Sequence, residues 1–350
     1  MIKLLKHNFK TRRLILIILS FISFLLTMVI TNQDIFIYSH FIDSELNVQE
    51  QVATNPPIVV PTVMACILAT IVPLFEFNFK MRKVNIDQYY SLPIKREKLY
   101  TSTFIFGFIE VIIPVTISYL YGVLAVFIKP SLFHNIHLLS YFFVLLSLTF
   151  CLYSIVSFVY TRNNTIIDGI INLLFVIFLG MILLSAINCI RQELNIQTTS
   201  YYLQAEFYSL YSPFIKVCDS FDLLLCSNFV SFEKNKIVAT VLSSILFTIV
   251  GIACFVLFVY LSKKEKAENC LQISNSWISY KTMIPIYTVC VLIITCSEFF
   301  LSLVFTSIAS FFAYVIYQRS FIFKKKNLIT MICSLIIGFL ILFVAGLFNF

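Results

Sequence analysis

The stretch IVATVLSSILFTIVGIACFVLFVYLSKKEK, residues 237–266, carries no charge from Ile237 to Leu261 and then three lysines within its last four positions. A helix needs about 20 apolar residues to cross the hydrocarbon core of a bilayer, so this run is long enough to span one. Lysine side chains at the end of a span reach the headgroup layer. The stretch therefore predicts a transmembrane helix that ends at a basic membrane surface.

Eight further apolar runs extend this pattern to the whole chain. Hydrophobic residues make up 60% of the 350 residues and charged residues 12%, against roughly 25% charged residues in ordinary soluble domains. Because so apolar a chain requires lipid as its solvent, we predict an all-α fold, a polytopic transmembrane helical bundle. The nine predicted spans, of which the seventh is the shortest, are 14–30, 58–76, 104–128, 138–160, 166–188, 237–261, 283–297, 300–318 and 328–347.

The segment Met1 to Arg13 has an apolar face and a basic face when it is drawn as a helix. These faces consist of Ile2, Leu5 and Phe9, and of Lys3, Lys6 and Lys10. A helix of this kind lies in the headgroup layer, so we expect an N-terminal interfacial helix that meets the first span at an elbow. No small-residue cleavage site follows between Phe21 and Ile30, and we interpret the first run as a span rather than a signal peptide.

Basic residues distinguish the two sides of the predicted membrane. With the N-terminus in the cytoplasm, 20 of the 25 Lys and Arg fall in inner segments, which satisfies the positive-inside rule. The outer segments hold Lys129, Arg191, Lys216, Lys234 and Lys236. The formal charge of +8 therefore indicates contact with anionic membrane lipids and not with nucleic acid. We expect a multi-pass protein of the cell membrane with a cytoplasmic N-terminus.

Glycine spacing excludes several catalytic and nucleotide-binding motifs. All seven glycines are isolated, so the chain has no G-x-x-x-x-G-K-[ST] phosphate loop, no G-x-G-x-x-G turn and no G-x-S-x-G elbow. A membrane-embedded enzyme would also need a His, Asp or Ser constellation at useful spacing, which the chain lacks. We therefore expect neither catalysis nor a cofactor in this chain.

The long outer segment 189–236 is rich in aromatic residues. Leu203, Phe207, Leu210 and Tyr211 fall at helical spacing until Pro213 interrupts them, and we expect the segment to pack on the outer membrane surface or to dip into it.

Cysteine and histidine indicate no metal site. Cys189, Cys218 and Cys226 share the outer segment, where a disulfide between two of them is possible but its pairing is open. His134 and His137 are three residues apart with no third ligand nearby, which is typical of a polar loop.

Two carboxylates lie within the apolar runs, Glu110 and Asp168. An acid in a span is costly to bury and is by default a functional candidate. Asp168 is the third residue of its span and can reach the interface or bond Asn172 one turn on, which favours a structural role. Glu110 is about 9 Å into its span at roughly 1.5 Å per residue, and Pro114 one turn later frees a carbonyl group. Glu110, Asp168 and Asn172 are the candidates for a translocation path.

The inner segment Phe77 to Tyr100 joins the second and third spans. Ser91 is a good helix cap and Pro93 is tolerated in a first turn, so a short helix is predicted to begin near Leu92. An amphipathic helix on the inner surface fits a groove in a soluble partner, while contact with lipid headgroups alone is the alternative. The predicted helix carries Ile94, Lys95, Lys98 and Leu99.

Three stretches resemble ABC transporter permeases of the ABC-2 type. Residues 87–107 contain Ser-Leu-Pro-Ile-x-Arg-x-x-Leu-Tyr running into a span, residues 162–169 (RNNTIIDG) open the fifth span, and residues 263–269 (KKEKAEN) follow the sixth. The resemblance covers most of residues 1–275, a core of six spans as is common in the family. Residues 276–350 add about three spans to the same membrane domain.

The resemblance implies a permease subunit of an ATP-driven exporter. Such a subunit pairs with a second permease, of the same or a related chain, and with cytoplasmic ABC ATPase subunits that bind the ATP. The first inner loop would act as a coupling helix on the ATPase, and the outer segment would be partly re-entrant. The residues expected to contact the ATPase are Tyr90, Leu92, Pro93, Ile94, Lys95, Arg96 and Leu99.

A secondary carrier is the alternative function, with Glu110 and Asp168 as proton or ion sites. Such carriers normally bury several ionisable residues near the bilayer midplane, and this chain has at most one there. An apolar path is compatible with peptides, lipids, drugs and small metabolites.

Overall fold

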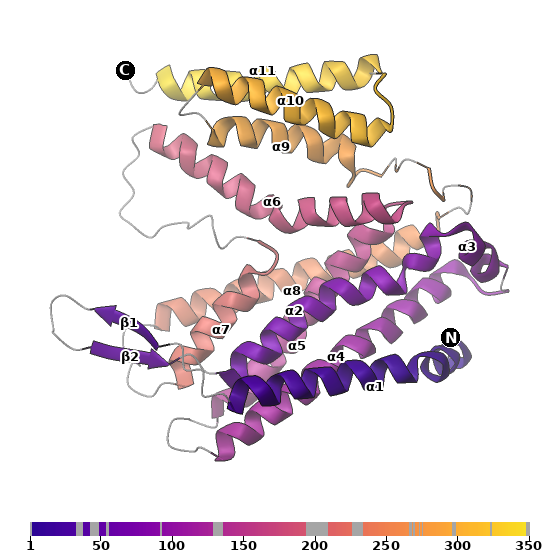
Figure 1. Cartoon of the computed structure of the whole chain (residues 1–350), viewed down its shortest axis with the longest axis vertical. Helices are drawn as coiled ribbons and strands as arrows, with labels where there is room; N and C mark the ends of the chain where they lie inside the picture. Colours follow the sequence, from indigo (N-terminus) through magenta and orange to yellow (C-terminus); the bar gives the residue numbers. More distant parts are fainter. Residues whose placement is uncertain are drawn as a thin grey trace. The chain divides into compact units, whose positions relative to one another are not determined.

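The fold is an all-α polytopic helical bundle with one short β-hairpin (Figure 1). The computed structural model describes residues 2–32, 38–42, 49–53, 56–91, 93–128, 136–193, 209–225, 234–265, 268, 270–272, 274, 276–295, 299–322 and 324–347.

Each predicted span coincides with a helix. Eight helices in the described part of the chain are long and apolar enough to cross a membrane, as expected of a multi-pass membrane protein. The ninth, α9, has 15 residues, a length of about 22 Å at 1.5 Å per residue. The helices are α1 (Ile2–Asn32), α2 (Pro56–Glu76), α4 (Arg96–Ile128), α5 (Ile136–Thr161), α6 (Ile166–Glu193), α8 (Lys234–Ser262), α9 (Tyr280–Ile294), α10 (Phe299–Gln318) and α11 (Lys325–Leu347).

Shorter elements lie between these helices. They are the strands β1 (Tyr38–Ile42) and β2 (Gln49–Ala53), the 3₁₀-helix η1 (Asn78–Met81), and the helices α3 (Lys83–Tyr90) and α7 (Ser212–Leu225). The two strands pair antiparallel, with Tyr38 opposite Ala53 and Ile42 opposite Gln49. The hydropathy pattern gave no indication of this hairpin.

The N-terminal segment is helical as predicted, but α1 is a single helix from Ile2 to Asn32. The expected elbow between an interfacial helix and the first span is therefore wrong. Nothing between Lys10 and Leu14 breaks a helix, since the segment contains neither proline nor glycine.

The outer segment also differs from its prediction. Leu210 and Tyr211 lie in a turn, and Pro213 is the second residue of α7. Proline thus begins a helix here instead of ending one, because the first turn of a helix does not need the amide hydrogen that proline lacks. Leu203 and Phe207 lie outside the described residues.

The chain forms two compact units that are interleaved in the sequence. Unit 1 consists of residues 1–79, 87–158 and 213–265, and unit 2 of residues 80–86, 159–212 and 266–350. Helix α6, which we had grouped with the preceding spans in the core 1–275, thus belongs with α9, α10 and α11.

Helix α4 is the centre of unit 1. It packs against α1, α2 and α8, and hydroxyl groups join it to α1: Ser23 donates to the carbonyl of Pro114 (3.1 Å), and Thr27 donates to Ser118 (3.0 Å). These hydroxyls find partners inside the bundle, where water is absent.

Unit 2 is centred on α9, which packs against α6, α10 and α11 (Figure 1). Tyr280, Ile284, Tyr314 and Tyr317 form one buried cluster in this unit. Ala186, Cys290 and Ile293 form a second. The tyrosine rings lie at the start of α9 and near the end of α10, beside the polar groups described below.

Helices α5 and α8 approach closely at Gly251. A Cβ atom at this position would lie 2.6 Å from the Cα of Cys151, so Gly251→Ala forces the two backbones apart. We expect a loss of about 1–3 kcal/mol in the free energy of unfolding, measured as a lower thermal midpoint of the purified protein in detergent.

Gly338→Ala is the matched control for this prediction. Its Cβ would lie 3.2 Å from a terminal methyl of Leu292, which a small side-chain rotation relieves. We expect this variant to stay within about 0.5 kcal/mol of the wild type. Equal stability of the two variants would contradict the close approach of α5 and α8.

Candidate functional site

The inner segment between α2 and α4 is folded differently from its prediction. The short helix is α3 (Lys83–Tyr90), which ends before Leu92, and α4 begins only at Arg96. Ser91 closes α3: its amide donates to the carbonyl of Asp87 (3.2 Å) and its hydroxyl to that of Gln88 (2.9 Å). A helix beginning near Leu92 is therefore wrong.

Pro93 explains why the chain leaves the helix at this point. Proline disfavours helical geometry in the residue before it and has no amide hydrogen to donate. The first bond of α4 joins the amide of Leu99 to the carbonyl of Lys95 (3.1 Å). The two helices are thus separated by a turn around Pro93.

An aromatic cluster in unit 1 holds this turn in place. The rings of Phe77 and Tyr100 are stacked at 6.2 Å, and Phe258 of α8 contacts Phe77 at 5.3 Å. Phe79 contacts Tyr89 of α3 at 4.8 Å and Tyr100 at 5.7 Å. The cluster therefore connects the inner ends of α2, α3, α4 and α8.

The predicted coupling residues divide into a buried and an exposed group. The hydroxyls of Tyr90 and Tyr100 are hydrogen-bonded (2.8 Å), and the guanidinium of Arg96 lies 4.7 Å from the centre of the Tyr90 ring. Leu99 is only 2% exposed and packs inside the unit, so it offers no surface to a partner. Leu92 lies outside the described residues.

The exposed group forms an apolar and basic surface. We call its members in unit 1 the inner surface patch, after the side on which the sequence predicts it; they are Pro93, Ile94, Lys95 and Lys98. Val84 of unit 2 is 79% exposed as well, although its position before the predicted helix had drawn no attention.

Lys80, which the sequence grouped with these basic residues, is buried. Its ammonium group donates to the carbonyl oxygen of Thr161 at the end of α5. A cation at this position satisfies a carbonyl that has no amide partner in the helix.

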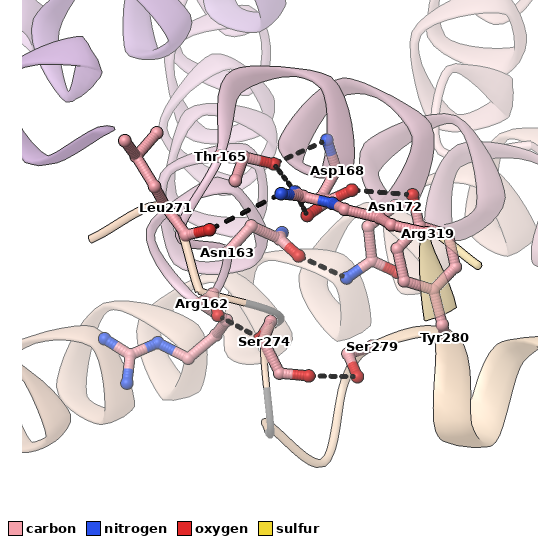
Figure 2. A network of polar contacts seen from close by, with 10 residues as sticks. All are labelled: Arg162, Asn163, Thr165, Asp168, Asn172, Leu271, Ser274, Ser279, Tyr280 and Arg319. Atoms are coloured by element: carbon pink, nitrogen blue, oxygen red, sulfur yellow. Dashed lines mark hydrogen bonds and ion pairs between the residues drawn. The ribbon is translucent and has the colours of Figure 1, made fainter. Parts of the chain in front are cut away.

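Asp168 lies at the start of α6 in unit 2, where Figure 2 shows it among polar partners. Tyr280 of α9 donates to one carboxylate oxygen (3.1 Å), and Arg319, directly after α10, forms an ion pair with the other (3.0 Å). The amide of Asp168 donates to the hydroxyl of Thr165 (3.2 Å), which caps α6. One carboxylate thus joins three helices.

Arg319 has an unusual backbone that orients its side chain. It adopts a left-handed conformation with φ of 50°, which costs roughly 1–2 kcal/mol for a residue other than glycine. Its guanidinium also reaches the hydroxyl of Thr165 (3.3 Å) and the carbonyl of Leu271 (3.4 Å). Leu271 is itself left-handed, with φ of 64°.

We had expected that Asn172 could hydrogen-bond to Asp168, but it does not. Asn172 instead binds the segment that leads into α9. Its amide donates to Asn163 (3.3 Å) and to the carbonyl of Ile278 (2.6 Å; Figure 2). Ser274 of the same segment donates to the carbonyl of Arg162 (2.7 Å). Asp168 and Asn172 therefore join segments of unit 2, which is the structural role that the sequence favoured for Asp168.

Glu110, the third translocation-path candidate, is buried in unit 1 with a second carboxylate. Gly107 lies one turn earlier in α4, against the hydroxyl of Tyr153. A Cβ atom at this position would lie 2.7 Å from Cγ of Glu76. Glu76, the last residue of α2, forms an ion pair with Arg12 of α1. Glu110 is 3% exposed, and its Oε1 atom has no hydrogen-bond partner among the described residues.

Sequence reasoning missed Glu76 and Arg12 as members of this site. Both were assigned to the inner ends of spans, Glu76 at the end of one apolar run and Arg12 just before another. The sequence places both at a similar depth in the predicted membrane, which was a signal that they could pair. The hydropathy pattern does not predict this contact, because 63 residues separate the two in the sequence.

Metal-ligand clusters are absent from the residues that the structure describes. Within the described ranges, no three His, Cys, Asp or Glu side chains are placed to hold a metal ion. His134 and Cys226 lie outside those ranges, and the thiol of Cys189 lies 4.0 Å from the carbonyl oxygen of Ile294. A disulfide in the outer segment stays a prediction.

Comparison with protein-family models, curated proteins and solved structures found no match. The resemblance to ABC-2 permeases therefore rests on the three sequence stretches alone.

Removing the guanidinium of Arg319 leaves Asp168 buried without its cation. We expect Arg319→Ala to lower the free energy of unfolding by about 1–3 kcal/mol, and the double variant Asp168→Asn/Arg319→Ala to recover most of the loss. Thermal unfolding of the four proteins in a double-mutant cycle measures the coupling. Lys324→Ala, an exposed change in the same turn, is the control, and purely additive effects of the two substitutions would contradict the pairing.

Proposed function

We propose that this chain is the transmembrane permease subunit of an ATP-driven transporter, an exporter that a separate cytoplasmic ATPase drives through the first inner loop. The observation that carries the proposal is the inner surface patch, an exposed apolar and basic surface seated on the aromatic cluster of α2, α3, α4 and α8. The resemblance of residues 87–107 to the coupling segment of ABC-2 permeases gives this surface its partner.

The proposal requires a partner protein because this chain carries no motif for ATP hydrolysis. The chain contains no phosphate-binding loop, so ATP binding and hydrolysis fall to another protein. The exposed Ile94, with the exposed Lys95 and Lys98 on the same segment, forms a typical apolar anchor with a charged rim. We propose that the ATPase binds there and that a second permease subunit completes the transporter in the cell membrane.

The aromatic cluster supplies a route for the motion. Rings in close contact transmit a displacement because a packed core resists compression. A shift of the turn at Pro93 would therefore move the inner ends of α2, α4 and α8 together.

A secondary carrier is the second candidate, and the buried Glu110 is the observation that favours it. Proton- or ion-coupled carriers use buried acids of this kind. Asp168, the other acid considered for this role, is already paired with Arg319, which leaves one carboxylate where carriers normally have several. Transport in vesicles that follows an ion gradient without ATP would favour the carrier.

The double variant Ile94→Asp/Lys95→Glu tests the coupling surface. It places negative charge on the apolar anchor and on its basic rim without touching the half-buried Tyr90 and Arg96 or the buried Leu99. Loss of an anchor residue costs about 2 kcal/mol of binding, roughly 30-fold in affinity. We expect a tagged chain, purified gently from its native membrane, to bring down ATP hydrolysis as wild type and to lose it as the double variant.

The matched control is Ile322→Asp/Lys324→Glu, the same change in the inner turn between α10 and α11, where Ile322 is 82% exposed. This control should retain the associated ATP hydrolysis. No ATP hydrolysis with the wild type, or the same loss in both variants, would contradict coupling through the first inner loop.

A further inference from the structure

Three charged side chains meet inside unit 1, each from a different helix. Arg12 of α1 forms an ion pair with Glu76 of α2, and the positive charge of Arg12 also acts on Glu110 of α4. Tyr153 of α5 lies against the same turn of α4, because its hydroxyl covers Gly107. The cluster is separate from the inner surface patch and from the Asp168 network of unit 2.

The cluster has one more negative group than positive groups. Arg12 forms an ion pair with Glu76, which is 2% exposed, so the guanidinium is already engaged. Glu110 is 3% exposed, and its Oε1 atom finds no hydrogen-bond donor among the described residues. An ionised carboxylate that is buried without a partner is strongly disfavoured, whereas the protonated acid is neutral.

The backbone adds a further acceptor at the same residue. Pro114 has no amide hydrogen, so the carbonyl of Glu110 loses its usual helical donor. The hydroxyl of Ser23 in α1 donates to the carbonyl of Pro114 (3.1 Å). The backbone carbonyl of Glu110 therefore lacks the amide donor that the helix would normally provide, and the Oε1 atom of its side chain has no donor among the described residues.

Among the described residues, Glu110 has no ion-pair partner of its own. Among the elements packed against α4, α1 contributes Arg12 and α2 contributes Glu76, while α5 contributes the hydroxyl of Tyr153. Helix α8 carries no charge from Ile237 to Ser262.

The space next to Gly107 limits the size of any cation that could neutralise Glu110. A single added carbon at this position would collide with the Tyr153 hydroxyl and with the side chain of Glu76. A proton on Glu110 needs no additional volume, and it supplies the donor that the carboxylate lacks.

We propose that Glu110 is a proton-binding site within the membrane-spanning part of unit 1, and that loss of its proton makes it compete with Glu76 for Arg12. The O–H bond of the acid breaks, the proton passes to water at the inner side of the bundle, and the electron pair stays on the carboxylate. One guanidinium then faces two anions on α2 and α4, and this changes the packing of both helices against α1.

This site does not depend on the ATPase proposal. A protonation change that repacks α1, α2 and α4 would be present whether an ATPase or an ion gradient drives transport. Failure of the coupling test at Ile94 and Lys95 would leave it untouched, and its own failure would leave the coupling surface intact.

Infrared spectroscopy of the purified full chain in lipid nanodiscs tests the proposal. A protonated carboxyl group has a C=O stretching band that a carboxylate lacks, and the band is followed above about pH 5, where exposed carboxyl groups are ionised. Over this pH range we expect wild type to show the band and to lose it as the pH rises, and we expect Glu110→Gln to lack it throughout. Glu110→Asp, which keeps the acid, should retain the band and shows that the loss is not a folding defect.

Glu76→Gln is the matched control, and it should shift the titration midpoint of the band in one predicted direction. It removes the partner of Arg12 and leaves the guanidinium beside Glu110, which favours the charged acid. We expect the band to persist and its titration midpoint to move by about 1 pH unit or more toward acid. A merely structural role for Glu110 would not move this midpoint.

Three results would overturn the proposal. They are a wild type without the band at any pH, a band that survives in Glu110→Gln, and a midpoint that Glu76→Gln leaves unchanged. A metal cation is the other occupant to be tested. If replacing choline chloride by sodium chloride removes the band at constant pH, the site binds a metal cation instead of a proton.

Discussion

The hydrocarbon layer offers no hydrogen-bond partners, and this constraint governs the whole chain. Backbone groups are therefore satisfied within helices, and polar side chains bond to their own helix or to the next one. The hydroxyls of Thr70, Thr149 and Thr248 each donate to the carbonyl four residues earlier, a common arrangement for Ser and Thr in apolar helices. Ser23 and Thr27 bond across to α4. These hydroxyl groups thus find their partners inside the bundle.

Charged groups follow the same rule and are largely used to hold helix ends. Arg319 neutralises Asp168, Arg12 neutralises Glu76, and Lys80 satisfies a carbonyl at the end of α5. Within the helices that the structure describes, Glu110 is a buried acid with no ion pair of its own. A bundle of this kind is consistent with an external source of energy acting on the inner surface patch.

The sequence predicted the spans well because each depends on about 20 neighbouring residues, as in the run 237–261, and length and hydropathy are local properties. Local propensity also misled: Ser91 is a good cap for a following helix, yet it closes the preceding one, and Pro213 begins a helix that it was expected to end. The charge pairs were beyond sequence reasoning, because Asp168 and Arg319 are 151 residues apart and only the packing of α6 beside α9 and α10 brings them together.

The orientation of the chain is the claim on which the coupling surface depends, and cysteine labelling in intact cells tests it most directly. Val84→Cys places a thiol at a side chain that is 79% exposed, and Gln51→Cys places one in the segment before α2 that we assign to the outside. A membrane-impermeant maleimide should label position 51 in intact cells and position 84 only after the membrane is permeabilised, each measured against the parent chain. Labelling of position 84 in intact cells would place the inner surface patch outside and contradict the account.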